Sequence, residues 1–212
     1  MNNNFQWFTH TPFLSNEQCD DIINKLQEET NWVSGYEGAH IVNANEKSFD
    51  NIVKDRTFVE LYAFQNTKHD YTWINDKLEP YVEMLNKQVW NFNIRGVSKD
   101  LKALKYSGSD RFDWHADYDK GKVSTNKLTC LIQLSDESEF EGGDLHFAFA
   151  NDGEFFKTPY KKGYVLIFPS IISHMVTELT SGERYIMREI ISGEPFRLSL
   201  IHISEPTRQA MI

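Results

Sequence analysis

Two segments in the first 90 residues place their apolar positions three and four residues apart, which is the spacing of an amphipathic helix. The first begins after Ser15, which stands three residues before Gln18 as in a capping box, and it predicts a helix over about 16–29. The second runs over 73–90 and contains Pro80, a residue that kinks or divides helices. We therefore expect two amphipathic helices early in the chain.

From about residue 93 onward the apolar pattern changes to short runs with a period of two. Gly, Asp and Ser separate these runs, which is typical of strands joined by turns. The runs predict strands at 103–106, 128–134, 143–150, 164–168 and 171–177. Shorter strands are expected before the second helix, at 32–33, 40–42 and 58–64. Helices followed by many strands favour an antiparallel β-barrel or jelly roll with the helices packed against one outer face.

Composition and charge exclude several classes of protein. The 212 residues, 40% of them hydrophobic and 14% aromatic, can build one buried core, so an intrinsically disordered chain is excluded. A formal net charge of −9 argues against a protein that grips nucleic acid through its whole surface. The N-terminus does not resemble a secretory signal, and no apolar stretch approaches a membrane span. The two distant cysteines give no disulfide framework. We expect a soluble, cytoplasmic protein with no membrane partner.

The C-terminal residues differ in character from the rest of the chain. Residues 198–208 resemble, residue for residue, a translated adapter from transposase-based DNA library preparation, although a natural last strand is the alternative. We therefore expect 198–212 to be a non-native tail. The rest predicts a single domain over 1–197, in which 1–99 support a β-rich core at 100–197.

Three side chains have the chemistry of a metal site. His115 and Asp117 are two residues apart, and on an extended chain such residues point to the same face. His174 follows a turn in a later predicted strand and is the third candidate. Two imidazoles and one carboxylate form the facial triad of non-haem Fe(II), which leaves coordination positions open. Taken alone, a His-x-Asp triplet is more often a surface pair, so the assignment depends on the residues that follow.

The segment after His174 predicts a hairpin with a loop at 180–182, whose glycine would take the left-handed position that such loops need. In this register Glu178 faces Arg184 and His174 faces Arg188. Arg184 then lies on the same face as His174, about 13 Å away along the strand. An arginine there can bind the far carboxylate of a 2-oxoacid through two parallel hydrogen bonds. The alternative is a surface pair between Glu178 and Arg184.

The ordered set of these motifs resembles the prolyl 4-hydroxylase-type branch of the 2-oxoglutarate/Fe(II) oxygenase superfamily. The resemblance covers about 100–197 and rests on Tyr106, His115-Ala116-Asp117, Phe140–Leu145, Gly163–Pro169 and the run from His174 to Arg184. It implies an α+β, mainly β fold, namely a double-stranded β-helix (jelly roll, cupin-like) with supporting N-terminal helices. It makes 100–197 the catalytic core.

The same resemblance assigns roles to individual residues. His115, Asp117 and His174 become the metal ligands and the catalytic centre. Arg184 becomes the anchor for 2-oxoglutarate, and Tyr106 becomes a second contact for it, with a core aromatic as the alternative. Arg188 departs from the family pattern, in which a small or apolar residue is more usual. We interpret it as a secondary anion contact or as the sign of a register shifted by a bulge.

The resemblance implies a dioxygenase that uses Fe(II), 2-oxoglutarate and O2, with ascorbate as a further candidate cofactor. Asp117 favours hydroxylation over halogenation, because halogenating relatives lack that carboxylate. We expect a prolyl residue in a peptide or protein as the substrate, recognised by the loops at 36–54 and 118–127. The alternatives are the same chemistry on a small molecule or nucleobase, and a catalytically silent β-barrel binding module. The presence of both Asp117 and Arg184 favours an active enzyme.

Overall fold

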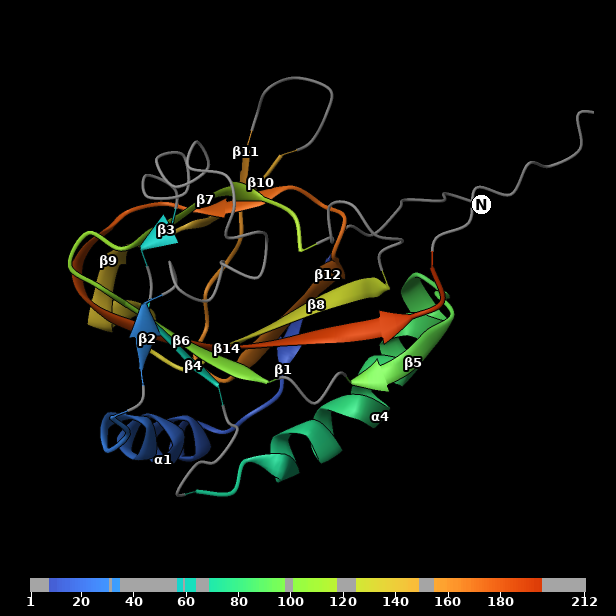
Figure 1. The fold of residues 1–212 in the computed structure, drawn as a ribbon, viewed down its shortest axis with the longest axis horizontal. Helices are drawn as coiled ribbons and strands as arrows, with labels where there is room; N and C mark the ends of the chain where they lie inside the picture. The colour runs from blue at the N-terminus through green and yellow to red at the C-terminus, as the bar shows by residue number, and fades with distance from the viewer. Residues whose placement is uncertain are drawn as a thin grey trace, which may run out of the picture.

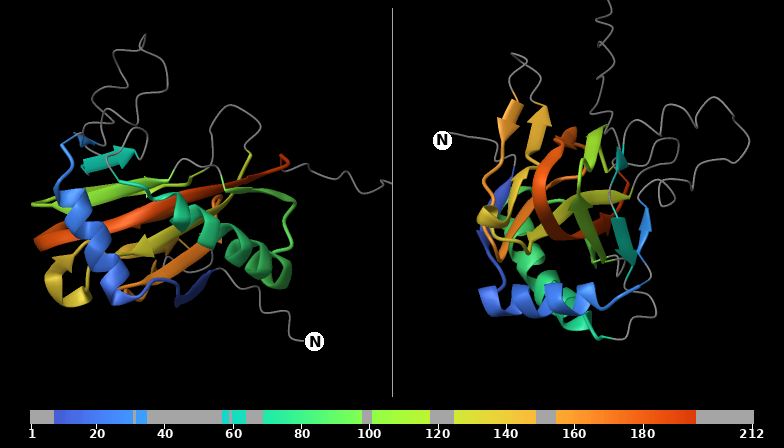
Figure 2. Two further views of the ribbon diagram at one scale, coloured as in Figure 1. Left: turned by 90° about the horizontal axis from the view of Figure 1, so that it is seen from below. Right: turned by 90° about the vertical axis from the view of Figure 1, so that its left-hand side faces the viewer.

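Two antiparallel sheets face each other, and two helices cover the outer face of the larger sheet (Figures 1 and 2). This computed structural model describes residues 8–30, 32–34, 57–58, 60–63, 69–97, 101–117, 125–148 and 155–195. No helix in these ranges is both long and apolar enough to cross a membrane. The predicted strand at 40–42 and the tail from residue 198 lie outside the described residues.

The larger sheet is built around one long strand, β14 (Leu179–Gly193). Its order is β1 (Thr9–Pro12), β12 (Tyr164–Pro169), β8 (Asn126–Gln133), β14, β6 (Lys102–Ser107), β4 (Glu60–Ala63) and β2 (Val33–Ser34). Two further strands, β5 (Ile94–Val97) and β9 (Phe140–Gly142), pair with other parts of β14, and a 3-10 turn at Glu137–Glu139 precedes β9. The smaller sheet has the order β11 (Phe155–Lys157), β10 (Leu145–Ala148), β13 (His174–Val176), β7 (Arg111–His115) and β3 (Thr57–Phe58).

The two predicted helices are present with bounds close to the expected ones. α1 spans Asn16–Gln27, and Ser15 and Gln18 form the predicted capping box in both directions. α4 spans Thr72–Val89 and continues through Pro80 without a break in its assignment. The buried faces of both helices pack on one side of the larger sheet, through residues such as Ile22 and Leu78. The prediction of helices on one outer face is therefore confirmed.

The strands of the larger sheet contribute to two cores, because alternate residues point to opposite faces. On β6, Ala103 packs towards the helices, whereas Leu104 and Tyr106 pack between the sheets. On β14, Met187 belongs to the helix side and Ile186 to the space between the sheets. The second core therefore lies between the two sheets, where the smaller sheet covers the larger one.

The predicted hairpin after His174 is wrong. β13 belongs to the smaller sheet and β14 to the larger one, so the chain crosses between sheets at 177–178 instead of turning back. Val176 and Leu179, on either side of this crossing, are both buried in the core between the sheets. A hairpin at 180–182 would keep both residues in one sheet, and the crossing lets the two sheets share this core.

The observed register replaces the predicted cross-strand pairs. His174 pairs with His115 and Phe147 rather than with Arg188. Arg184 pairs with Tyr106 rather than with Glu178. Gly182 does adopt a left-handed φ of 77°, but it does so inside β14, opposite Phe140 of β9. The expected strand at 171–177 begins only at His174, after a turn.

Candidate functional site

Three potential metal ligands converge at the edge of the core between the sheets. His115 ends β7 and His174 begins β13, and the antiparallel pairing sets them opposite each other with ring centroids 4.2 Å apart. Asp117 follows β7 by two residues, and its carboxylate oxygens lie 3.9 Å from Nε2 of His115 and 3.7 Å from Nε2 of His174. The three ligand atoms lie within 4.8 Å of one another. One ion can contact all three.

Both imidazoles are oriented by backbone carbonyls. Nδ1 of His115 lies 2.7 Å from the carbonyl oxygen of Asp113, and Nδ1 of His174 lies 2.9 Å from that of Ile172. A carbonyl only accepts, so Nδ1 carries the proton and the lone pair of each neutral ring is on Nε2. Phe112 stacks on the His115 ring at 3.7 Å between centroids, which fixes its plane. Both Nε2 atoms are therefore free to bind a metal.

The Asp117 carboxylate is buried and held by hydrogen bonds. The Thr129 hydroxyl donates to Oδ2 at 2.7 Å, and the Asn126 amide donates to the Asp117 backbone carbonyl at 2.7 Å. Burial raises the Asp117 pKa, but His174, Arg188, His115 and Thr129 together outweigh it, so the pKa is lowered. Burial and the neighbouring His174 lower the His115 pKa to about 4. These are the protonation states that metal ligands need.

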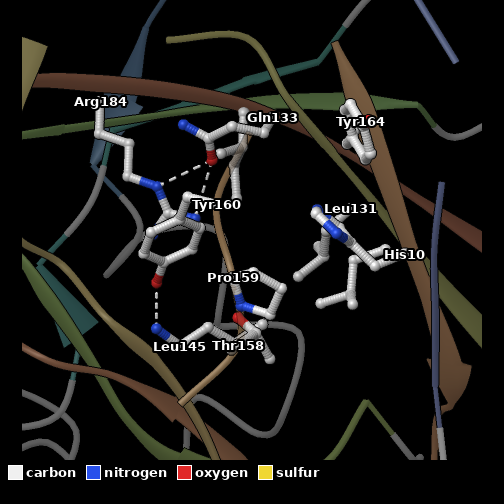
Figure 3. Close-up of a pocket in the computed structure, with 11 residues that line it drawn as sticks. His10, Leu131, Gln133, Leu145, Thr158, Pro159, Tyr160, Tyr164 and Arg184 are labelled. Carbon is white, nitrogen blue, oxygen red and sulfur yellow. Dashed lines mark hydrogen bonds between the residues drawn. The ribbon is translucent and has the colours of Figure 1, made fainter. Parts of the chain in front are cut away.

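A second charged group, Arg184 on β14, is buried in the same region with only 2% exposure. Its Nε and Nη2 each donate to Oε1 of Gln133 at 3.1 Å, and Nη1 donates to the Gly143 carbonyl at 2.6 Å. The Tyr160 ring lies 4.1 Å from its guanidinium carbon (Figure 3). No carboxylate pairs with Arg184 among the described residues. A buried cation without a counter-ion is costly, so this guanidinium has the properties of an anion site.

The metal ligands and Arg184 line one cavity between the sheets. Its remaining wall is mainly apolar and includes Leu104, Tyr106, Phe112, Leu131, Leu145, Val176, Ile186 and Arg188. Tyr106 is buried, and burial raises its pKa well above the usual value, so its hydroxyl stays protonated. Arg184 also lines a neighbouring cavity, together with His10, Gln133, Thr158 and Tyr160 (Figure 3). Arg184 therefore lies between the two cavities.

Arg188 lies at the metal end of the cavity that the metal ligands line. Its Nη1 is 3.5 Å from Oδ1 of Asp117, and its Nε is buried without a hydrogen-bond partner among the described residues. The predicted hairpin register, which placed Arg184 and Arg188 near the metal, is wrong. They still share the cavity, because they are four residues apart on one strand and so point to the same face.

Sequence reasoning missed the polar residues that support this site. Thr129 and Gln133 both lie in the predicted strand at 128–134, and each is a polar side chain in an otherwise apolar run. Because a buried polar group needs a partner, such residues indicate a site, and their spacing of four places both on one face. Tyr160 follows β11 and had no comparable signal.

Comparison with known proteins gives the family. Residues 101–191 match the model of the 2OG-Fe(II) oxygenase superfamily. This region of the chain, which holds the three candidate ligands and Arg184, is that of a 2OG-Fe(II) oxygenase. A PKHD-type hydroxylase of Synechococcus sp. is 22% identical over 210 residues, which cover 93% of this chain and 85% of that protein. The family and the three converging ligands make Fe(II), 2-oxoglutarate and O2 the cofactor and co-substrates of this 2-oxoglutarate oxygenase.

Solved structures share the fold, and several of them are prolyl hydroxylases. A Pseudomonas putida prolyl-4-hydroxylase has a TM-score of 0.61 at 12% identity, with 89% of this chain and 93% of that chain covered. A Trichoplax adhaerens prolyl hydroxylase, solved with a peptide fragment of the hypoxia inducible factor oxygen degradation domain, has a TM-score of 0.65 at 12% identity, with 90% and 85% covered. These likenesses show that the chain shares its fold with those enzymes, and the family match supports a dioxygenase.

Proposed function

We propose that this oxygenase hydroxylates a C–H bond of a prolyl residue in a peptide or protein, at an Fe(II) ion held by His115, Asp117 and His174. The observation that carries the proposal is the convergence of these three ligand atoms within 4.8 Å in a cavity that also contains the buried Arg184. Two neutral imidazoles and one carboxylate fit Fe(II) and leave positions open for co-substrates. We also propose that the two sheets form a double-stranded β-helix within a single domain over 1–197.

We assign Arg184 to the distal carboxylate of 2-oxoglutarate and Tyr106 to a supporting contact. Three of the five N–H groups of Arg184 donate to Gln133 and Gly143, so two are left for an incoming carboxylate. Tyr106 pairs with Arg184 across the strands and its protonated hydroxyl can donate. Arg184 lies four residues before Arg188 on β14, about 13 Å along the strand, so 2-oxoglutarate would extend from the metal towards it.

When bound, Fe(II) and 2-oxoglutarate reduce O2 with release of succinate and CO2, and they oxidise a C–H bond of the substrate. The residues of this chain contribute position and environment. The carbonyls of Asp113 and Ile172 hold both histidine rings in the metal-binding tautomer. Thr129 holds Asp117 in the charged form. The apolar wall of the cavity excludes water from the reacting atoms, which strengthens every charge interaction there.

The proposal of a prolyl substrate is supported by the structural neighbours of this chain. One structural neighbour is a prolyl-4-hydroxylase, and another is a prolyl hydroxylase solved in complex with a peptide fragment. The expected recognition loop at 36–54, and 118–124 of the second loop, lie outside the described residues. The same metal chemistry on a small molecule or nucleobase is the rival function. A silent binding module is disfavoured by the complete set of three ligands with Arg184.

The test is an incubation of the Fe(II)- and 2-oxoglutarate-loaded protein with O2 and a peptide array that varies the residues around proline. Mass spectrometry would detect the gain of one oxygen atom, and succinate would be measured in parallel. Oxygen gain on prolyl peptides is expected, and Asp117→Ala should abolish it. Turnover of a free metabolite or nucleobase with no oxidised prolyl peptide would overturn the substrate assignment and leave the metal chemistry in place.

A further inference from the structure

Arg188 is the charged residue of the cavity that the proposed function does not use. It lies beside the metal ligands, with Nη1 at 3.5 Å from Oδ1 of Asp117, while its Nε is buried and has no hydrogen-bond partner in the part of the chain that the structure describes. An unpartnered N–H in a buried position costs free energy comparable to a lost hydrogen bond. Its side chain retains 23% exposure at the cavity, so an incoming ligand can reach it.

The charges that line the cavity do not balance when the site is loaded. The Fe(II) ion, Asp117, the two carboxylates of 2-oxoglutarate and Arg184 together carry no net charge. The guanidinium of Arg188 adds one positive charge, and the other residues of the cavity wall are apolar side chains, a tyrosine and the two histidines, which are neutral when they bind a metal. Once Asp117 binds the metal, its charge is shared with the ion and no longer balances Arg188. A largely apolar cavity with one surplus positive charge favours a ligand that carries one negative charge.

We propose that Arg188 binds a carboxylate of the substrate, and that this carboxylate belongs to the residue that is oxidised, as it does in a C-terminal prolyl residue. The inference rests on the proposed function and narrows its substrate class. Because Arg188 lies next to a metal ligand, an anion paired with it lies next to the metal as well, within the length of one residue from the reacting carbon. The fork of an arginine binds a carboxylate through two parallel hydrogen bonds, and its free Nε can supply one of them.

The rival role for Arg188 is a contact to the carboxylate of 2-oxoglutarate that chelates the metal. The two roles differ in what a substitution changes. If Arg188 contacts the substrate, its substitution leaves the affinity for 2-oxoglutarate unchanged and removes the preference for an acidic substrate over its neutral amide. If Arg188 contacts 2-oxoglutarate instead, its substitution lowers the affinity for 2-oxoglutarate and leaves that preference unchanged.

The experiment uses the full chain loaded anaerobically with Fe(II) and 2-oxoglutarate, whose visible charge-transfer band reports binding without turnover. N-acetyl-L-proline and N-acetyl-L-prolinamide, which differ only in the charge of the terminal group, are titrated as probes. We expect the acid to perturb the band and to bind about tenfold to a hundredfold more tightly than the amide, the range of a charge-assisted hydrogen-bonded pair. Arg188→Met should remove this difference, and Arg188→Lys should retain part of it. Arg95→Met, a change at an exposed arginine paired with Glu194, is the matched control and should leave it intact.

Equal binding of acid and amide to the parent protein would overturn the inference. So would an Arg188→Met variant that loses 2-oxoglutarate affinity while it keeps the preference for the acid, because Arg188 would then serve the co-substrate. Failure of the parent to form the charge-transfer band at all is a separate result, seen before any probe is added. It would overturn the proposed function and this inference together.

Discussion

The candidate metal ligands are held in position by neighbouring residues that do not themselves contact the metal position. Thr129 illustrates this, because its hydroxyl donates to Asp117 at 2.7 Å and contacts the Ser170 hydroxyl at 3.0 Å. Without it, one oxygen of a carboxylate that is only 6% exposed loses its partner. A hydrogen bond to a charged group contributes about 1.5–3 kcal/mol, and partners of metal ligands commonly change metal affinity by about tenfold to a hundredfold.

Thr129→Val should therefore weaken Fe(II) binding by about tenfold to a hundredfold while the protein stays folded, since the two side chains have nearly the same shape. Isothermal titration with Fe(II) under anaerobic conditions measures this. Thr125→Val, at a threonine outside the strand, is the control. Unchanged Fe(II) affinity in Thr129→Val would show that the hydroxyl does not position Asp117.

Arg184 gives a second prediction at this scale. It is 2% exposed, donates to Gln133 and Gly143, and has two N–H groups left. Arg184→Ala should weaken 2-oxoglutarate binding by about 2–4 kcal/mol, the loss expected when one partner of a buried charge pair is truncated. Fe(II) affinity should change little, because the contacts of Arg184 do not include the metal ligands. If Arg188→Ala weakened 2-oxoglutarate binding and Arg184→Ala did not, the anchor would have to be reassigned to Arg188.

At the scale of elements, the sequence predicts strands better than it predicts how they pair. The spacing of apolar residues predicted both helices and most strands to within a few residues, because each of these elements buries one face. The partner of each strand depends on contacts distant in sequence. The segment at 180–182 has the residues of a turn, yet it continues β14, since burial of Val176 and Leu179 requires a crossing between sheets. The candidate ligands were found from spacing and resemblance, and their role as metal ligands stays a prediction.

A substitution at Gly182 tests whether β14 packs against β9 just after the crossing between the sheets. It has a φ of 77°, and a Cβ there would lie 2.0 Å from the Glu139 carbonyl oxygen, where β14 meets β9. Gly182→Ala should therefore cost about 2–5 kcal/mol, the sum of left-handed strain and a clash with backbone. Gly108→Ala is the matched control, because its φ is 57° but nothing lies near its Cβ, so only about 1–2 kcal/mol is expected. Urea denaturation of both variants measures the difference, and equal losses would mean that β9 does not pack against Gly182.

At the scale of the whole molecule, the site joins the two sheets. The smaller sheet and the residues just after it supply His115, Asp117 and His174, while the larger sheet supplies Arg184 and Arg188. Ligands that contact both sheets bind the folded chain and not the unfolded one, so they stabilise it by mass action. When Fe(II) is bound, 2-oxoglutarate at about 100 times the dissociation constant of 2-oxoglutarate should add about 2.7 kcal/mol to the free energy of unfolding. Anaerobic thermal denaturation with and without ligands measures this, and Arg184→Ala should lose most of the gain from 2-oxoglutarate. A gain in Arg184→Ala equal to that of the parent at the same ligand concentrations would contradict the assigned binding mode.

The most direct test of the central claim is an anaerobic titration of the protein with Fe(II) and then 2-oxoglutarate, followed by visible absorption. We expect one Fe(II) per chain and a weak charge-transfer band that appears only when 2-oxoglutarate is added. His174→Ala and Asp117→Ala should each lose the band, whereas His69→Ala, at a histidine beside Glu28 and outside the cavity, should keep it. An Asp117→Ala variant that binds Fe(II) and 2-oxoglutarate as tightly as the parent, with the same band, would contradict the account.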